Sequence, residues 1–220
     1  GNTVSVVDPP RFGVRVNAMD YGGRFTKERP PVMYVARANE LSLREDEGAS
    51  WSRRFVGPAN FSNNGVDRIR DVVMDPLSWR IAYMVTRDRV FRIQRAGLAD
   101  EQIVELTGNL AGLKATNDAA FGSANGINLQ AVELYVGGEP NALLVAGQGG
   151  VYRLLGPDLY DGSTPITWSQ YGEGLPNILA TDLVYSEPGD RLVVAPWGRG
   201  VWSVPDASTS LPVAKFKLAD

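Results

Sequence analysis

The sequence predicts an all-β fold, a β-propeller of about four blades with four antiparallel strands in each blade. The main observation is a four-strand unit that recurs roughly every 50 to 60 residues, a spacing typical of propeller blades with extended loops. The 220 residues also include 24 glycines and 14 prolines, above the average of about 12% for the two types together. Such composition suits short strands joined by tight turns.

The first and second strands of each unit are short apolar segments separated by a turn that contains glycine or proline. The second strands are apolar along their length, which is expected of strands buried on both faces. They are therefore predicted to lie in the interior of each blade. The first strands lie at 16–21, 70–75, 130–135 and 181–186, and the second strands at 32–36, 81–85, 142–146 and 191–195.

The third and fourth strands are expected nearer the outside of the propeller than the first two. Apolar and polar residues alternate more clearly in the third strands, which indicates one wetter face. A fourth strand closes the first three units but is missing from the last one, where either the tail 213–218 or the N-terminal segment 3–7 could supply it. The third strands lie at 41–44, 90–93, 151–154 and 201–204, and the fourth at 50–55, 103–106 and 166–170.

Residues 1–220 are interpreted as a single propeller region. Its blades lie at about 14–60, 66–112, 127–176 and 177–220, with a strand from 1–10 as one way to complete the last blade. A sheet of this size has two apolar faces, so it must stack against neighbouring blades. Four blades are few for a ring, which predicts a part of a larger propeller. Further blades or a second chain would then close the ring; a self-closed four-blade ring is the alternative.

The composition excludes several kinds of chemistry. The chain has no histidine and no cysteine, which rules out a Ser–His–Asp triad, a histidine- or thiolate-ligated metal and a cysteine nucleophile within it. The net charge is −3 and the charged residues are interspersed, so nucleic acid is not an expected partner. No stretch of 18 apolar residues occurs, so no membrane span is predicted.

Two parts of the sequence carry a family resemblance. Asp46, Gly48 and Trp51, with Ser50 in place of threonine, match the Asp-box pattern Ser-x-Asp-x-Gly-x-Thr-Trp, although Arg44 departs from its serine. The run 171–177 followed by 182–185 and 196–202 adds to the match. The chain thereby resembles the BNR/Asp-box propellers, which include sialidase-like, sortilin-like and xyloglucanase-like proteins. The resemblance implies that Asp46, Gly48, Ser50 and Trp51 have a structural role in a turn at the rim.

The expected function is that of a non-catalytic propeller module in a larger, secreted or cell-surface bacterial protein. It would act as a structural scaffold or bind a protein or a glycan. The resemblance implies one alternative, part of a sialidase- or xyloglucanase-like glycoside hydrolase with paired carboxylates. Asp20, Asp75, Glu133 and Asp182 lie on or beside first strands, and Asp75 and Asp182 are the candidates that we name for such a pair. An assembly-factor propeller of the photosystem-assembly type is a further alternative.

Tryptophan side chains are the main candidates for binding. Trp79 is predicted to lie in the turn between the first and second strands of its unit, and Trp197 between the second and third strands, close to Arg199. An exposed tryptophan in a loop can contact a carbohydrate or a protein. It can also pack as a plug against the next blade, which is the role that we favour for both residues.

No cofactor and no metal are expected, with calcium as the one exception to consider. Asp67, Asp71 and Asp75 lie close together in the sequence, and oxygen ligands suit calcium. No EF-hand loop is present, so roles in turns are expected for these aspartates.

Overall fold

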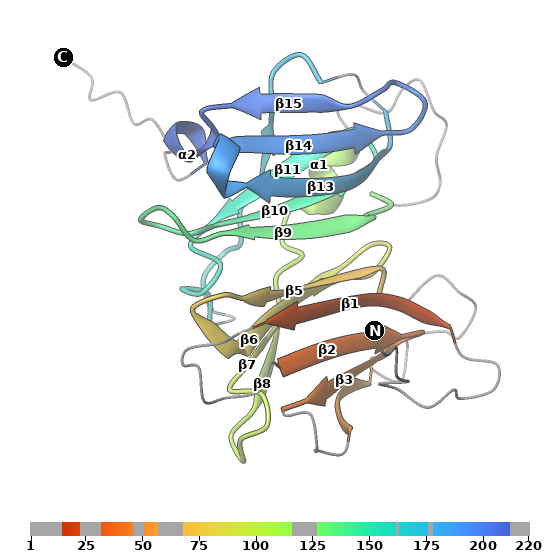
Figure 1. Ribbon diagram of the computed structural model, residues 1–220, viewed down its shortest axis with the longest axis vertical. Coiled ribbons are helices and arrows are strands. Elements are labelled where there is room, and N and C mark those ends of the chain that lie inside the picture. Colours follow the sequence, from red (N-terminus) through yellow and green to blue (C-terminus); the bar gives the residue numbers. More distant parts are fainter. Residues whose placement is uncertain are drawn as a thin grey trace, which may run out of the picture.

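Four separate antiparallel sheets follow one another along the chain in the computed structural model (Figure 1). The structure describes residues 15–22, 32–45, 51–56, 68–115, 127–161, 163–175 and 178–211. Three sheets have four strands in consecutive order, and the fourth has three strands among the described residues. Each sheet corresponds to one blade, which confirms the predicted all-β propeller architecture.

The blades are numbered in chain order. Blade one comprises β1 (Val16–Gly22), β2 (Val32–Arg37), β3 (Glu40–Arg44) and β4 (Ser52–Val56). Blade two comprises β5 (Asp71–Asp75), β6 (Ser78–Val85), β7 (Val90–Gln94) and β8 (Gln102–Glu105). Blade three comprises β9 (Ala131–Tyr135), β10 (Ala142–Gly147), β11 (Gly150–Leu155) and β12 (Ser169–Tyr171). Blade four comprises β13 (Ala180–Ser186), β14 (Arg191–Pro196) and β15 (Trp202–Pro205). Two short helices lie outside the sheets: α1 (Leu110–Ala115) follows β8, and α2 (Ala207–Ser210) follows β15.

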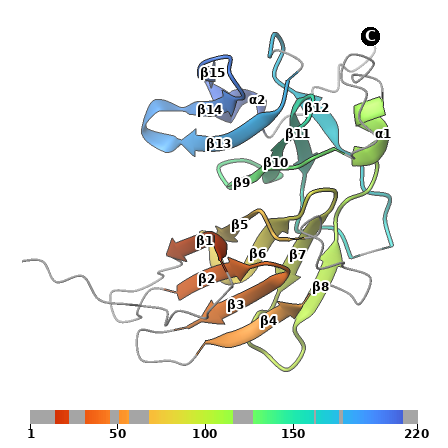
Figure 2. The same ribbon diagram turned by 90° about the vertical axis from the view of Figure 1, so that its right-hand side faces the viewer.

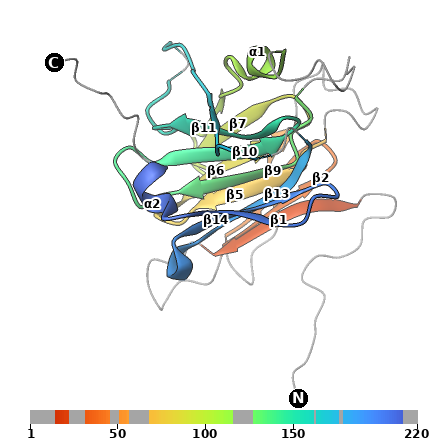
Figure 3. The same ribbon diagram turned by 90° about the horizontal axis from the view of Figure 1, so that it is seen from above.

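The innermost strands of the blades lie side by side in chain order, and the sheets fan outward from them (Figures 2 and 3). Strand β1 packs on β5, β5 on β9, and β9 on β13. Among the described residues, no equivalent packing joins β13 back to β1. Within the described ranges the four blades therefore form an open fan. The outer face of blade four exposes Asp182, Val184 and Ser203, whereas Val35, Arg37 and Ser42 on the outer face of blade one are buried.

Apolar side chains fill the three spaces between neighbouring blades, each forming a separate core cluster. Blades two and three bury side chains on both of their faces, as the apolar second strands predict. This stacking is what the hydrophobic effect stabilises in the fold. Fully buried members are Tyr34, Leu41, Met84 and Ile93 in the first space, Val85, Leu143, Val145 and Tyr152 in the second, and Ala142, Leu144, Val151 and Leu192 in the third.

Trp168 connects blade three to the end of blade two. Its indole is only 1% exposed, and its Nε1–H donates to the Leu106 carbonyl over 2.7 Å. Its backbone N–H donates to Asn109 Oδ1 over 2.7 Å, while Asn109 Nδ2–H donates back to the Trp168 carbonyl over 3.2 Å. One large side chain thus fills the core between the blades and also satisfies polar groups in both of them.

Two arginines on third strands reach across to the following blade. Arg92 of β7 is 2% exposed and donates to the carbonyls of Pro157 and Tyr160 in blade three. Arg153 of β11 donates to the Ser210 carbonyl over 2.6 Å, at the end of α2. The guanidinium group offers several donors in a fixed plane, which suits it to hold irregular backbone at a blade interface.

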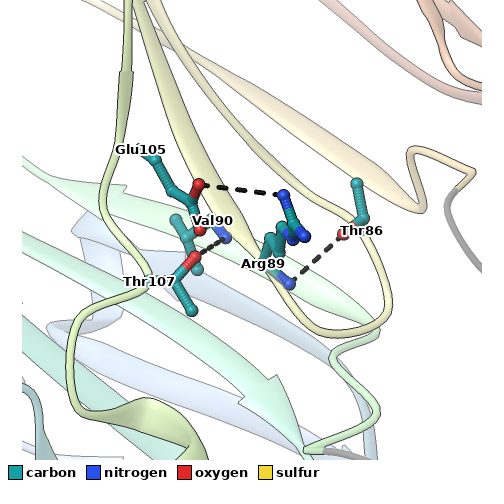
Figure 4. A network of polar contacts seen from close by, with 5 residues as sticks. All are labelled: Thr86, Arg89, Val90, Glu105 and Thr107. Carbon is teal, nitrogen blue, oxygen red and sulfur yellow. Dashed lines mark hydrogen bonds and ion pairs between the residues drawn. The ribbon is translucent and has the colours of Figure 1, made fainter. Parts of the chain in front are cut away.

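A small polar network fixes the turn between β6 and β7 and attaches the outer strand β8 (Figure 4). The Arg89 backbone N–H donates to Thr86 Oγ1, and the Val90 N–H donates to Thr107 Oγ1. The Arg89 guanidinium lies 3.9 Å from the Glu105 carboxylate, at the surface. The hydroxyl groups of Thr86 and Thr107 therefore accept the backbone N–H groups that have no partner in the strand pairing at this turn.

The strands lie within a few residues of the predicted segments, and the differences concern blade ends. Strand β6 begins at Ser78, so Trp79 lies in the strand and not in the preceding turn. After β15 the chain forms α2, where Ser210 Oγ lies 2.6 Å from the Tyr171 hydroxyl of blade three. The segments 3–7 and 213–218, either of which could complete blade four, lie outside the described residues. No helix in the described ranges is long and apolar enough to cross a membrane.

Candidate functional site

Each innermost strand carries one carboxylate that faces the next blade. In the first three blades this group is Asp20 on β1, Asp71 on β5 and Glu133 on β9, and each accepts a backbone N–H from the innermost strand that follows. Met74 N lies 2.6 Å from Asp20 Oδ2, Val132 N lies 2.9 Å from Asp71 Oδ2, and Tyr185 N lies 3.4 Å from Glu133 Oε2. We call these contacts the axial bonds.

The second oxygen of each axial carboxylate accepts the N–H of the next residue in its own strand. These distances are 2.7 Å for Asp20, 2.9 Å for Asp71 and 3.1 Å for Glu133. An innermost strand has backbone donors on its free edge, which need acceptors when the edge is covered. The carboxylates supply such acceptors, and the axial bonds each satisfy one backbone donor on the inner edge of blades two, three and four.

Asp182 is the acidic residue of β13, the innermost strand of blade four. Its Oδ1 accepts the Leu183 N–H over 2.9 Å, which matches the bond within the strand seen in the other three blades. The side chain is exposed, and among the described residues no following strand donates to it. In blade four, therefore, the Asp182 carboxylate has the bond within its own strand but, among the described residues, no axial bond.

Burial and mutual repulsion raise the pKa values of two axial carboxyls. Loss of solvation raises the pKa of Asp71 from its ordinary value of 3.8 to about 6, against the effect of its two N–H donors, and the charges of Asp182 and Asp20 add to the rise. Loss of solvation likewise raises the pKa of Glu133 from 4.5 to about 7, with smaller contributions from Asp20 and Asp71. The four carboxylates thus share one electrostatic environment near the inner edges of the blades.

The raised pKa values predict a loss of stability as the pH rises from about 4 to about 7. In this window the folded state binds more protons than the unfolded state, so the free energy of unfolding falls with pH. Each group contributes at most about 1.4 kcal/mol per pH unit. Chemical denaturation of the wild type and of the double variant Asp71→Asn/Glu133→Gln, measured across this range, tests the assignment. An equally steep pH dependence in the double variant would contradict it.

Asp75 lies at the end of β5 and has a different role from the axial carboxylates. It is 6% exposed, and its Oδ1 accepts the Leu77 N–H over 2.7 Å, which stabilises the turn into β6. Burial raises the pKa of Asp75, and among nearby charges Asp158 of blade three acts in the same direction. Beside it, a groove of about 540 Å³ is lined by the loops of blades two and three, including Leu77, Pro140, Asp158 and Leu159.

The structure does not bring Asp75 and Asp182 together as a pair. Asp75 is the last residue of β5 in blade two, whereas Asp182 is the third residue of β13 in blade four, and these blades are not neighbours. Asp75 is engaged in its turn, and the carboxyl on which the charge of Asp182 acts is Asp71. The described residues also contain no group of three or more acidic side chains placed to hold a metal ion, and Asp67 lies outside those residues.

The two candidate tryptophans have opposite surroundings. Trp79 is 8% exposed, belongs to the core between blades one and two, and lies 3.9 Å from the Arg80 guanidinium. Its carbonyl accepts the Tyr34 hydroxyl over 2.9 Å. Trp79 thus packs as a plug between two blades. Trp197, by contrast, is 69% exposed at the end of β14.

Trp197 belongs to an exposed turn between β14 and β15, which we call the aromatic turn (197–202). Its exposed apolar members are Trp197 at 69%, Val201 at 72% and Trp202 at 41%. Arg199 lies between them and is also exposed; its carbonyl accepts the Trp202 Nε1–H over 2.9 Å. The turn is anchored by the Trp197 N–H, which donates to the Leu179 carbonyl over 2.8 Å. The side chains of Trp197 and Trp202 are thus exposed to solvent on a turn that backbone and side-chain hydrogen bonds fix in place.

Asp46, Gly48 and Ser50 lie outside the described residues. Trp51 is described, directly before β4, and the Arg37 guanidinium lies 5.6 Å from its ring centre. The structural role of these four residues stays a prediction.

The axial bonds are the feature of the site that sequence reasoning missed. From the sequence, Asp20, Glu133 and Asp182 are candidates for acid or base groups and Asp71 for a metal ligand; their role as acceptors between blades is visible only in the structure. The signal was present, because every predicted first strand contains an acidic residue among mainly apolar ones, and the strand at 70–75 contains two, Asp71 and Asp75. Its meaning depends on which face of the strand the residue occupies, and that depends on the stacking.

No protein-family model and no curated protein matches the sequence. Solved structures are similar in fold. The β-propeller domain of Cps50 (Swd1) from Myceliophteria thermophila has 12% identity and a TM-score of 0.54, over 86% of this chain and 51% of that chain. PorZ, a surface component of the type-IX secretion system of Porphyromonas gingivalis, has 13% identity and a TM-score of 0.60, over 95% and 28%.

A third similar structure is a humanized mutant of the Chaetomium thermophilum Polycomb Repressive Complex 2. It has 10% identity and a TM-score of 0.52, over 87% of this chain and 39% of that chain. This chain therefore spans about half of the Swd1 chain and less than half of the other two. At these identities the likeness shows the propeller fold alone.

Proposed function

We propose that this chain is a non-catalytic propeller module that binds a protein partner through the aromatic turn. The observation that carries the proposal is the exposure of Trp197, Val201 and Trp202 on one anchored turn with Arg199 among them. Tryptophan and arginine are the residue types that most often dominate binding energy at protein interfaces. A solvent-exposed cluster of this kind is costly to keep without a partner to cover it.

The carboxylate geometry favours this function over a glycoside hydrolase. Both oxygens of Asp71 and of Glu133 accept backbone N–H groups, so these carboxyls hold blades together. Asp75 is committed to its turn. An acid and a base that act on a sugar need free oxygens on either side of a cleft, and the described carboxylates are not arranged in that way.

The setting in a larger bacterial surface protein is part of the same proposal. The similar structures support it, because one is described as a bacterial surface component of a secretion system and another belongs to a multi-protein complex. The proposed kinship with the BNR/Asp-box propellers is supported by the match at 44–51, where Trp51 directly precedes β4.

The test is capture of a partner by the immobilised chain from an extract of its source organism, followed by titration with the purified partner. Trp197→Ala is expected to raise the Kd by about thirtyfold, the effect of losing a hot-spot side chain. Leu98→Ala is the matched control, because Leu98 is a 40% exposed apolar residue in the turn between β7 and β8 of blade two. This control is expected to bind like the wild type.

Two results would contradict the proposal. Equal loss of binding in Trp197→Ala and Leu98→Ala would show that the aromatic turn is not the contact surface. Binding of a glycan by the wild type, abolished by Trp197→Ala, would replace the protein partner by a carbohydrate.

A further inference from the structure

We propose that the groove between the loops of blades two and three binds a peptide segment of a protein partner, in which an apolar side chain lies close to a lysine or an arginine. The groove lies beyond the ends of the innermost strands β5 and β9, since Leu77 and Val136 line it. The aromatic turn lies instead beside the start of β13, where Pro196 pairs with Ala180. The two surfaces are therefore separate, and the inference does not rest on the aromatic turn.

Exposed apolar side chains from two blades form the walls of the groove. Leu77 is 59% exposed in the turn after β5, and Leu159 is 73% exposed in the loop after β11. Pro140 is also exposed, in the loop between β9 and β10. The volume of about 540 Å³ lies within the usual range of ligand sites. Covering apolar groups that line a concave surface is favourable, so an apolar side chain is one part of the expected occupant.

Hydrogen bonds fix the turns that carry the two leucines. The Leu77 N–H donates to Asp75 Oδ1 over 2.7 Å. The Leu159 N–H donates to the Gly156 carbonyl over 3.0 Å, and the Gly156 N–H donates to the Asn141 carbonyl over 2.8 Å. A Cβ atom at Gly156 would lie 2.8 Å from Leu159 Cδ1, so the leucine side chain lies back over its own loop.

Arg92 of blade two fixes the same loop of blade three from the buried side. Its guanidinium donates to the carbonyls of Pro157 and Tyr160, which flank Asp158 and Leu159 in the sequence. Arg92 is 2% exposed, so these bonds are shielded from water. Both walls of the groove are thus preorganised, and a ligand can bind without the cost of ordering a loop.

The rim of the groove is acidic. Glu139 and Asp158 are exposed, and no lysine or arginine is among the described residues that line the groove. Burial raises the pKa of Asp75 beside the groove, and the charge of Asp158 adds to the rise. Arg92 is a cation of the same region, but it is buried and donates to loop carbonyls. A lysine or an arginine next to the apolar side chain of a ligand would therefore complement the rim.

The walls and the rim together select one class of peptide. An acidic segment would place like charges beside Glu139 and Asp158, and a purely polar segment would leave Leu77 and Leu159 uncovered. Lysine and arginine suit both parts of the groove, because their methylene stems pack on apolar walls while their charged ends reach the carboxylates. The expected occupant is thus an apolar and basic segment.

Selection from a library of random dodecapeptides displayed on phage tests the proposal. The library is first depleted on the variant Leu77→Ser/Leu159→Ser, which removes peptides that bind elsewhere on the chain. It is then selected on the wild-type chain of 220 residues. The selected peptides are expected to carry lysine or arginine within a few positions of leucine, isoleucine or phenylalanine more often than the starting library does.

Fluorescence anisotropy with a selected synthetic peptide then measures the contribution of the two leucines. Leu77→Ser/Leu159→Ser is expected to raise the Kd at least about thirtyfold, because both apolar walls are lost. Leu98→Ser is the matched control, since Leu98 is a 40% exposed leucine in the corresponding loop of blade two, after β7, and does not line the groove. The control is expected to bind like the wild type, and circular dichroism verifies that both variants fold.

The variant Glu139→Gln/Asp158→Asn tests the acidic rim. It is expected to raise the Kd about fivefold at low ionic strength and to have little effect at high salt, because exposed charge pairs are weak and are screened by ions. Glu187→Gln is the control, at an exposed position in the turn between β13 and β14 of blade four. It should leave the Kd unchanged.

Recovery of no peptide after the depletion step would overturn the groove as a peptide site. Selected peptides without basic side chains would overturn the assigned charge of the occupant. Equal losses of binding in Leu98→Ser and in Leu77→Ser/Leu159→Ser would place the contact outside the groove. Each of these results stands whether or not the aromatic turn binds a partner, because the depletion step removes peptides that bind that turn.

Discussion

Replacing Trp168 by alanine is expected to lower the free energy of unfolding by about 3–5 kcal/mol, the usual cost of removing a fully buried tryptophan. The side chain is 1% exposed and lies in the core between blades two and three. The substitution leaves a cavity, and it also leaves the Leu106 carbonyl without its indole donor. Urea denaturation followed by circular dichroism measures the change.

Trp197→Ala is the matched control for this experiment. The same side chain is removed, but Trp197 is 69% exposed and contributes little buried surface. Its free energy of unfolding is expected to change by less than about 0.5 kcal/mol. Similar losses in the two variants would contradict the distinction between a core tryptophan and a surface tryptophan.

Replacing Arg92 by methionine is expected to lower the free energy of unfolding by about 3 kcal/mol. Methionine keeps much of the apolar stem, so the change mainly removes the donors to the carbonyls of Pro157 and Tyr160. Those carbonyls lie in the loop of blade three against blade two, and losing their buried donor leaves them unsatisfied. Thermal unfolding monitored by circular dichroism and denaturant titration both report the loss.

Arg153→Met gives the comparison within the same fold. Arg153 stands at the corresponding place on the third strand of the next blade and donates to the Ser210 carbonyl, but it is only partly buried. Water can replace its donors more easily, so a smaller loss of about 1 kcal/mol is expected. A larger loss for Arg153→Met than for Arg92→Met would show that burial does not decide the effect.

The strands could be predicted because their signals are local. The apolar segments at 142–146 and 151–154, with the turn between them, became β10 and β11 almost without change. Alternation, apolar runs and turn residues act over a few neighbouring positions, so they survive in the sequence pattern. The end of blade four was less predictable, because α2 is held by contacts to Tyr171 and Arg153 of blade three.

The sequence indicated which residue types could bind a partner, but not which of these residues are exposed. Trp79 lies three residues after Pro76 and Trp197 directly after Pro196, yet Trp79 is 8% exposed and Trp197 is 69% exposed. The difference arises because Trp79 faces a neighbouring blade, whereas the aromatic turn lies at the last blade of the fan. No local pattern contains that information, since it depends on which surfaces meet.

The sequence by itself determined that this chain is a repeated set of short antiparallel strands without histidine or cysteine chemistry, because composition and periodicity are properties of neighbouring residues. Only the tertiary structure decided what the acidic residues of the first strands do. Asp20, Asp71 and Glu133 become acceptors between blades, and Asp182 is left open, because stacking brings the free edge of one innermost strand against the side chain of the previous one. A buried edge needs partners for its backbone donors, and that need arises only when the blades assemble.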